Sequence, residues 1–322
     1  MVINIISNQI KKTATRGPKK VLVNLIKGLD IIGVDYVFNQ PINNYKYNWI
    51  QDSISALVEV SFLNIPTLLG PNISVKPKDL PYLRHKVNKN SIYLQPSKWS
   101  KSVWLAEGFN ECKVEEWPVG IDTDLFYYID RFNLTPKILV YFKQRKNQEL
   151  DACINLLNKC GIDFCILKYG DYSEDQFMVN LKECTFCIWI GCDESQGIAM
   201  QEALSTNMPI IVIKDTSSQY NSYDSSSAPY FDNTCGVLLE NISLLSEHLI
   251  NSFNPRKYNP RKYIINNLSL EVCAKIFLEK IKILNVYKLR KFNLKYLGVL
   301  VHWIELPFRK STFKILFSKI RI

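Results

Sequence analysis

The sequence predicts an α/β protein with two doubly wound, Rossmann-like domains and a basic C-terminal tail. Short β-branched runs alternate with longer segments of helical period, which is typical of parallel sheets with crossover helices. This alternation starts near residue 2 and starts again after the stretch 132–136. The length of 322 residues suits two domains of roughly 150 residues each. We therefore expect domains over residues 1–133 and 134–285, and a tail over residues 286–322.

The first domain is expected to begin with the strand VINII, followed by a loop over residues 13–17. A helix over residues 18–32 follows, because Pro18 suits a first helical turn and apolar residues then recur at spacings of three and four. These apolar residues are Val21, Leu22, Leu25, Ile26 and Leu29. The later elements are strands at 35–38, 66–69 and 91–95 and a helix at 98–107.

The second domain is expected to begin with the buried strand KILVYFK, which starts at Lys137. Its helices are predicted at 147–159, 174–182 and about 197–205, and its further strands at 164–167, 184–190 and 210–213. A polar, Ser-rich segment follows at 216–232, and its length suggests a loop over a cleft. In doubly wound sheets of this kind, ligands bind beyond the carboxyl ends of the strands.

Nearly all of the positive charge lies near the C-terminus. The net charge is +10, and residues 282–322 hold ten Lys or Arg against one acid, Glu305. The rest of the chain therefore carries only +1, so we expect no nucleic-acid partner. Residues 287–322 mix basic with large apolar side chains, as interfacial segments attracted to anionic lipids do. The alternative is a helix packed on the body with its basic face in water.

The sequence predicts a cytoplasmic protein without a transmembrane helix. The N-terminal segment MVINIISNQIKKTATRG places its apolar part before its charges, which is the reverse of a secretory signal. The apolar stretch 296–308 contains His302, Glu305 and Pro307 and is shorter than the roughly 20 residues that span a bilayer. The tail remains a candidate for peripheral association with the inner face of the membrane.

The sequence contexts of the cysteines also indicate a cytoplasmic protein. Nine cysteines lie mostly in apolar contexts, which is typical of reduced thiols in the cytoplasm. Cys184 and Cys187 have the C-x-x-C spacing of zinc and redox sites, but no second pair follows at zinc-site spacing. Asp122 and Asp124 imitate a D-x-D metal motif, but an aspartate in the stretch WPVGIDTD is suited to cap a turn. We expect no metal and no cofactor.

The stretch CDESQGIAMQEAL, residues 192–204, carries the strongest functional pattern. It follows a predicted strand, so Glu194 lies in a loop at the carboxyl end of that strand, and Gly197 lets the backbone approach a ligand closely. The helix that follows presents unpaired N–H groups to a phosphate. Glu202, further along this helix, is suited to accept hydrogen bonds from neutral hydroxyls. Diphosphate at a helix mouth with carboxylates on either side describes a nucleotide-sugar site.

Glu194 and Glu202, with seven residues between them, resemble the E-x7-E signature of retaining GT-B glycosyltransferases, especially glycosyltransferase family 4. The stretches QPSKW at 95–99 and WPVGID at 117–122 resemble segments of the same family and occur in the same order. The similarity extends from about residue 91 to residue 285. Without this agreement, two glutamates at this spacing would be read as solvated surface charge.

The resemblance implies a hexosyltransferase-type enzyme of polysaccharide biosynthesis. It would move a sugar from a nucleotide-diphosphate donor to a glycan or lipid-linked acceptor, with retention of configuration and without metal. The residues that match the family's site are Glu194, Arg145 and Lys146 as catalytic residues, and Lys143, Gly197, Ile198, Glu202, Arg16 and Gly17 as donor-binding residues. Glu194 would contact the donor sugar and Glu202 the ribose, while cations from the run KQRK would hold the diphosphate.

Three departures from the family leave alternatives open. The first loop has one glycine, Gly17, where the family has a pair. The chain reads Gly70-Pro71-Asn72 where the family often has a histidine. The run KQRK compresses the family's Arg and Lys, so which of its cations hold the diphosphate is open. The alternative functions are a GT-B nucleotide-sugar epimerase and a non-catalytic module that binds glycan or membrane.

Overall fold

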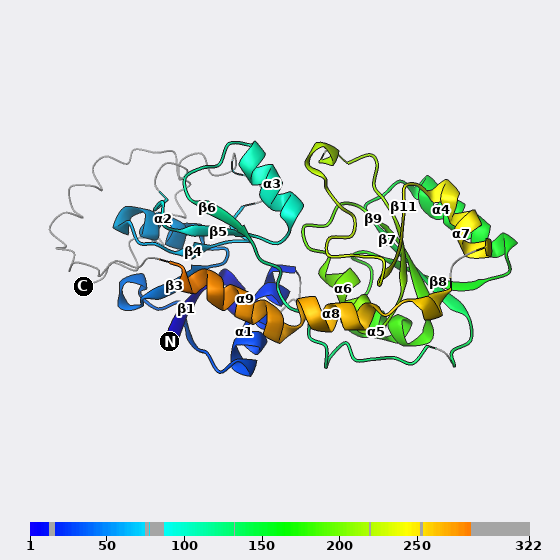
Figure 1. The fold of residues 1–322 in the computed structure, drawn as a ribbon, viewed down its shortest axis with the longest axis horizontal. Coiled ribbons are helices and arrows are strands. Elements are labelled where there is room, and N and C mark those ends of the chain that lie inside the picture. Colours follow the sequence, from blue (N-terminus) through cyan, green and yellow to red (C-terminus); the bar gives the residue numbers. More distant parts are fainter. Residues whose placement is uncertain are drawn as a thin grey trace.

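The computed structural model describes residues 1–12, 17–74, 77, 87–131, 133–218, 220–251 and 254–284. The chain forms two parallel sheets, one of six and one of five strands, that lie in separate halves of the molecule (Figure 1). Helices cover these sheets, as expected for doubly wound domains. The predicted fold class of two Rossmann-like domains is therefore confirmed. Arg16 and the tail over residues 286–322 lie outside the described residues.

The sheet of the first domain has the strand order β2-β1-β3-β4-β5-β6, and all its paired strands are parallel. Its strands are β1 (Val2–Ile6), β2 (Asp35–Phe38), β3 (Tyr47–Ile50), β4 (Leu68–Leu69), β5 (Ile92–Gln95) and β6 (Lys113–Glu116). The helices in this part of the chain are α1 (Gly17–Ile31), α2 (Ile54–Leu63) and α3 (Lys98–Ala106). Helix α1 buries Val21, Leu22, Leu25 and Leu29 against the sheet, as their helical spacing predicts.

The sheet of the second domain has the order β11-β10-β9-β7-β8, again with parallel pairing. Its strands are β7 (Lys137–Lys143), β8 (Asp163–Lys168), β9 (Phe186–Gly191), β10 (Ile210–Ile213) and β11 (Gly236–Leu239). Its helices are α4 (Asn147–Lys159), α5 (Glu174–Glu183), α6 (Ile198–Ser205), α7 (Leu245–Asn251) and α8 (Pro260–Leu268). The central strands β7, β9 and β10 are almost wholly buried, as their continuous apolar runs predict.

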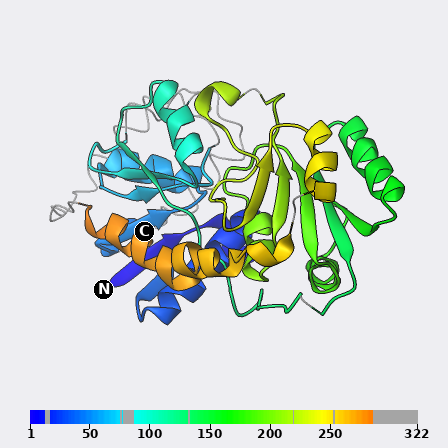
Figure 2. The ribbon, with the colours of Figure 1, turned by 45° about the vertical axis from the view of Figure 1, so that its right-hand side comes forward.

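The last described helix returns to the first domain. Helix α9 (Leu270–Lys282) runs beside α1 in both views (Figures 1 and 2). Phe277 and Ile281 of α9 are fully buried in the core of the first domain. The indole N–H of Trp117 donates a 3.0 Å hydrogen bond to the carbonyl of Cys273. The structure thus packs α9 with the first domain, although the expected boundary assigned residues up to 285 to the second.

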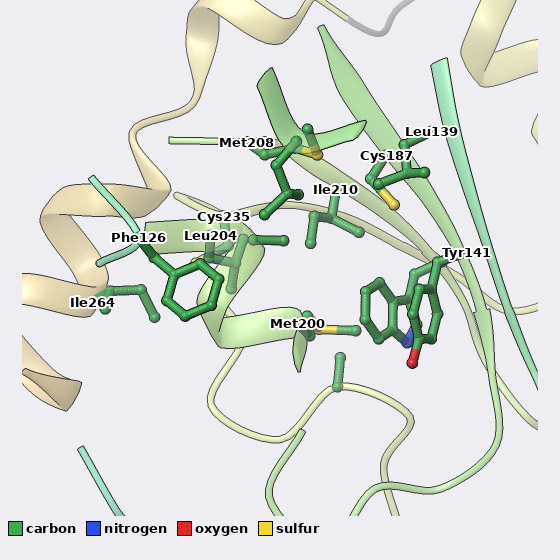
Figure 3. Close-up of a cluster of buried hydrophobic side chains, with 14 of the residues drawn as sticks. Phe126, Leu139, Tyr141, Cys187, Met200, Leu204, Met208, Ile210, Cys235 and Ile264 are labelled. Carbon is green, nitrogen blue, oxygen red and sulfur yellow. The ribbon is translucent and has the colours of Figure 1, made fainter. Parts of the chain in front are cut away.

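Helix α6 is anchored by the core of the second domain (Figure 3). Met200 and Leu204 of this helix are buried beside Tyr141 of β7 and the residues of β10. The rings of Tyr141 and Trp189 stack at a centroid distance of 3.7 Å and bridge β7 and β9. This packing fixes the N-terminus of α6 relative to the ends of the strands beside it.

Several expected elements match those observed within one or two residues, among them β2, β7, α4 and β10. Strands β3, β6 and β11 and helices α2 and α7 were not predicted. Cys184 lies with its sulfur 3.4 Å from that of Cys165, and Cys187 is buried on β9.

Within the described part of the chain, no helix is long and apolar enough to cross a membrane.

Candidate active site

The carboxyl ends of two central strands meet beside the mouth of α6. Lys143, the last residue of β7, pairs in register with Gly191, the last residue of β9. The loop 192–197 then leads into α6, and Gly197 caps this helix with a φ of +83°. Glycine adopts this left-handed conformation without strain. Since the first N–H groups of a helix have no partner within it, this corner of the sheet is suited to an anion.

Glu194 is held at this corner by contacts from both domains. Its carboxylate lies 2.6 Å from the Nζ atom of Lys143, and Lys143 also lies over the ring of Tyr169. The indole N–H of Trp99, on α3 of the first domain, donates a 2.9 Å hydrogen bond to the carbonyl of Glu194. Burial raises the pKa of Glu194 above its ordinary value, and the attraction of Lys143 only partly opposes this effect.

Glu202 is buried on α6 with a relative exposure of 2%. Its Oε1 atom lies 2.6 Å from the Nζ atom of Lys20, which reaches it from α1 of the first domain. Its Oε2 atom has no hydrogen-bond partner among the described residues. Burial raises the pKa of Glu202 to about 7, against the opposing influence of Lys20. The carboxylate is therefore held from one side with one oxygen still able to accept a hydrogen bond.

The guanidinium group of Arg145 is engaged in hydrogen bonds with the protein. Its Nη1 atom donates to the carbonyls of Gly191 and Ile213, and its Nη2 atom to that of Lys214, at 2.9–3.1 Å. Its Nε and Nη2 atoms also donate to the two carboxylate oxygens of Glu149. These five bonds use the five N–H donors of a guanidinium group. In this arrangement Arg145 ties the ends of β9 and β10 to α4 and has no donor left for a phosphate.

The other expected residues are placed as follows. Lys146 is exposed at the N-terminus of α4 and has no ion-pair partner within the described part of the chain. Ile198 is half-buried and contacts the cores of both domains. Gly17 begins α1 beside open space, because a Cβ atom added there would meet nothing within 4 Å. Of the cations in the run KQRK, the structure therefore brings Lys143 to Glu194 and leaves Lys146 accessible.

A pocket of about 420 Å³ lies between the two domains beside this corner. Ser195, Gln196 and Ile198 line it from the second domain. The first domain and the loop after β10 contribute the remaining lining residues, Gly17, Pro18, Val21, Pro71, Asn72, Ile73, Ser74, Gln95, Pro96, Trp99, Ser100, Val103 and Tyr220. These described lining residues include no charged side chain. Asn72, from the stretch Gly70-Pro71-Asn72, stands in the pocket wall.

Gln95 gives this pocket an unused hydrogen-bonding group. The residue is 4% exposed, and its Nε2 atom has no hydrogen-bond partner among the described residues. The rings of Trp99 and Tyr220 lie together at a centroid distance of 5.6 Å. Apolar and aromatic walls with a few convergent polar groups are typical of small-molecule sites.

Two sets of contacts that hold the site in place were not predicted from the sequence. Gln196 makes one set and Tyr230 makes the other. The side chain of Gln196 accepts from the backbone N–H of Val119 and donates to its carbonyl, which ties the loop 192–197 to the linker between the domains. The hydroxyl of Tyr230 donates to the carbonyl of Pro96 and lies 2.6 Å from Glu116. Neither Gln196 nor Tyr230 has a sequence context that signals a partner this far along the chain.

The contacts of Lys20, Asn24 and Lys27 were also not predicted, although the spacing of these residues in the sequence indicates that they share one face of a helix. Lys20, Asn24 and Lys27 follow one another at helical spacing on α1. Asn24 donates to the carbonyl of Gly120, and Lys27 forms a 2.6 Å ion pair with Asp122. With the Lys20 contact, this polar stripe joins α1 to the linker and to the second domain.

Asp122 serves as a turn cap. One oxygen accepts from the backbone N–H groups of Asp124 and Leu125, and the other pairs with Lys27. Burial acts to raise the pKa of Asp122, but Lys27 and these N–H groups outweigh it and lower the value. Among the described residues, no three His, Cys, Asp or Glu side chains gather so as to hold a metal ion.

Comparison with known proteins identifies the fold. No protein-family model matches the sequence, and no curated protein matches it either. Anabaena HepE, solved in complex with UDP and glucose, has a TM-score of 0.57 at 10% identity and covers 88% of this chain and 99% of its own. Sucrose-phosphate synthase from Thermosynechococcus elongatus has a TM-score of 0.54 at 12% identity, over 86% and 97%. UDP-GlcNAc 2-epimerase from Methanocaldococcus jannaschii has a TM-score of 0.50 at 13% identity, over 88% and 99%. The chain therefore has the two-domain GT-B fold.

Proposed function

We propose that the protein is a GT-B glycosyltransferase that transfers a sugar, of hexosyl type, from a nucleotide-diphosphate donor to a glycan or lipid-linked acceptor. The observation that carries this proposal is the corner where Lys143, Glu194 and the N-terminus of α6 meet beside the interdomain pocket. A cation and a carboxylate 2.6 Å apart lie there beside the first N–H groups of a helix. Solved proteins of this fold include one in complex with UDP and glucose.

The chemistry follows from these placements. The leaving diphosphate develops negative charge, which Lys143 and the N–H groups at the mouth of α6 can stabilise. The ammonium group of Lys143 has three donors, so it can contact a phosphate while it remains beside Glu194. Glu194 is positioned to accept hydrogen bonds from donor-sugar hydroxyls, and Glu202 from the ribose. This scheme uses no metal, and transfer with retention of configuration is part of the proposal.

The pocket on the side of the first domain is suited to the acceptor. Its aromatic and apolar walls can contact the face of a sugar ring or an apolar carrier, and the Nε2 atom of Gln95 offers a hydrogen-bond donor to a hydroxyl. A glycan acceptor uses both features.

The activity test combines turnover with matched variants. Release of free nucleotide diphosphate from UDP-, GDP-, ADP- and dTDP-sugars would be measured with and without a mixture of glycan acceptors. Glu194→Gln is expected to lower turnover roughly tenfold to a hundredfold, because a neutral amide replaces the charged acceptor of hydrogen bonds from the donor sugar. Glu183→Gln, which removes an exposed ion pair with Lys137 at the opposite end of β7, is the control and is expected to keep full turnover.

Other outcomes of this assay point to the other functions. An epimerase would convert the donor to a second nucleotide sugar without an acceptor, which proton NMR detects. A non-catalytic module would bind no nucleotide sugar and release none. Equal turnover by Glu194→Gln and wild type would contradict the site assignment.

Peripheral membrane association through residues 287–322 is a separate part of the proposal, based on the composition of this tail alone. Co-sedimentation with vesicles containing anionic lipids would compare the full chain with a chain ending at residue 286. Loss of binding on truncation is expected, and equal binding by both would contradict membrane association through the tail.

A further inference from the structure

Lys20 is a first-domain residue whose ionic partners lie in the second domain. It extends from α1, and its Nζ atom lies 2.6 Å from Glu202 on α6 and 2.9 Å from Glu174, the first residue of α5. The ring of Phe126 lies 5.8 Å from the same atom. The side chain of Lys20 is 19% exposed, so this ion pair is shielded from much of the solvent.

The pair leaves one oxygen of Glu202 unused. Lys20 takes Oε1, while Oε2 is buried and has no partner among the described residues. A buried carboxylate oxygen without a hydrogen bond is unfavourable, and a hydroxyl from a ligand would satisfy it. Because Glu174 also holds Lys20, the lysine need not leave Glu202 when such a hydroxyl arrives.

We propose that Lys20 is a positioning residue that orients Glu202 for the ribose hydroxyls of the donor, so that the nucleotide subsite is complete only when α1 is docked on the second domain. This inference rests on the proposed function, since it assigns a regulator to the same donor site. Closure of the two domains and nucleotide binding are then linked through one side chain. A ligand that lacks ribose hydroxyls makes no use of that link.

In the opposite case, the ion pair between Lys20 and Glu202 blocks the site, and the nucleotide must break it in order to bind. In that reading Lys20 occupies the ribose subsite, and its removal strengthens nucleotide binding. The two readings therefore predict changes of affinity in opposite directions. The second carboxylate partner of Lys20 and the unused oxygen of Glu202 favour the positioning role.

The experiment compares nucleotides with and without ribose hydroxyls. Calorimetric titration would use UDP, GDP and ADP and the 2′,3′-dideoxy form of each, with wild-type protein, Lys20→Met and Lys20→Arg. Lys20→Met is expected to weaken binding of the preferred nucleotide roughly tenfold, the effect of losing a charged hydrogen-bond partner, and to change binding of its dideoxy form less than about twofold. Lys20→Arg is expected to restore most of the affinity.

Lys27→Met is the matched control. Lys27 lies two turns further along α1 and also makes a 2.6 Å ion pair outside the helix, with Asp122 in the linker. If general loosening of α1 weakened binding, this variant would behave like Lys20→Met. It is expected to bind both forms of the nucleotide as wild type does.

A double variant protects the test against misfolding. In Lys20→Met/Glu202→Gln the buried carboxylate is neutralised, so loss of the lysine leaves no unpaired charge. Its affinity is expected to equal that of Glu202→Gln alone. Tighter nucleotide binding by Lys20→Met, or equal weakening for the dideoxy form, would overturn the positioning role. A wild-type protein that binds none of the nucleotides would instead overturn the proposed function.

Discussion

The buried carboxyl group of Glu202 makes the stability of the protein depend on pH in a direction that can be measured. Burial raises its pKa from an ordinary 4.5 to about 7. The folded protein therefore holds this proton more strongly than the unfolded chain does. The contribution to the free energy of unfolding is fully present below pH 4.5 and is lost as the pH rises through 7. Glu202→Gln removes the titrating group and keeps its shape.

The magnitude follows from the shift. The difference between 4.5 and about 7 corresponds to about 3 kcal/mol at about 1.4 kcal/mol per pH unit. Compared with Glu202→Gln, the wild type should lose about 3 kcal/mol of unfolding free energy between pH 4.5 and pH 8. Titrating groups that do not interact with Glu202 are common to both proteins and cancel in the difference.

Urea denaturation followed by tryptophan fluorescence would measure this difference at pH 4.5, 5.5, 6.5 and 8. Glu183→Gln, which removes an exposed carboxylate paired with Lys137, reports the effect of losing a surface ion pair. A difference between wild type and Glu202→Gln that stays constant over this range would refute the reasoning. A wild type that gains stability relative to the variant as pH rises would show that Lys20 outweighs burial.

Two further predictions concern residues that shape the site. Arg145→Leu should lower the free energy of unfolding by about 3–5 kcal/mol in urea denaturation, because it leaves Glu149 and three carbonyls without their donor. Lys146→Ala should change it by less than about 0.5 kcal/mol, and equal effects would contradict the structural role of Arg145. Gly197→Ala should lower it by about 1–2 kcal/mol, because alanine is strained at a φ of +83° while its Cβ would meet neighbours only at 3.6 Å or more. An unchanged melting temperature would contradict this conformation.

Much of the second domain could be predicted because its sequence is locally consistent. The runs KILVYFK and IIVI are continuous and apolar, and they form the buried strands β7 and β10. The elements that escaped prediction have weaker signals. Strand β6 buries only one of its four residues and β11 is partly exposed, so neither carries a full strand pattern. No local pattern in the sequence indicates that helix α9 packs with the first domain.

The candidate site was predictable in residue type and only partly in geometry. The loop and helix around Gly197 follow from the order of strand, glycine and helix. The environment of Arg145 does not, since its partners are carbonyls at the ends of β9 and β10, and any sequence supplies carbonyls. The cross-domain contact between Lys20 and Glu202 joins residues 182 positions apart, so it depends on how the two domains dock.

The most direct test of the central claim is a crystal structure of the protein with the nucleotide diphosphate that it binds best. We expect the diphosphate at the mouth of α6, within hydrogen-bond distance of the helix N–H groups and of the Nζ atom of Lys143. We also expect a ribose hydroxyl at the Oε2 atom of Glu202. A nucleotide bound away from this corner of the sheet, with Glu194 and Glu202 untouched, would contradict the account.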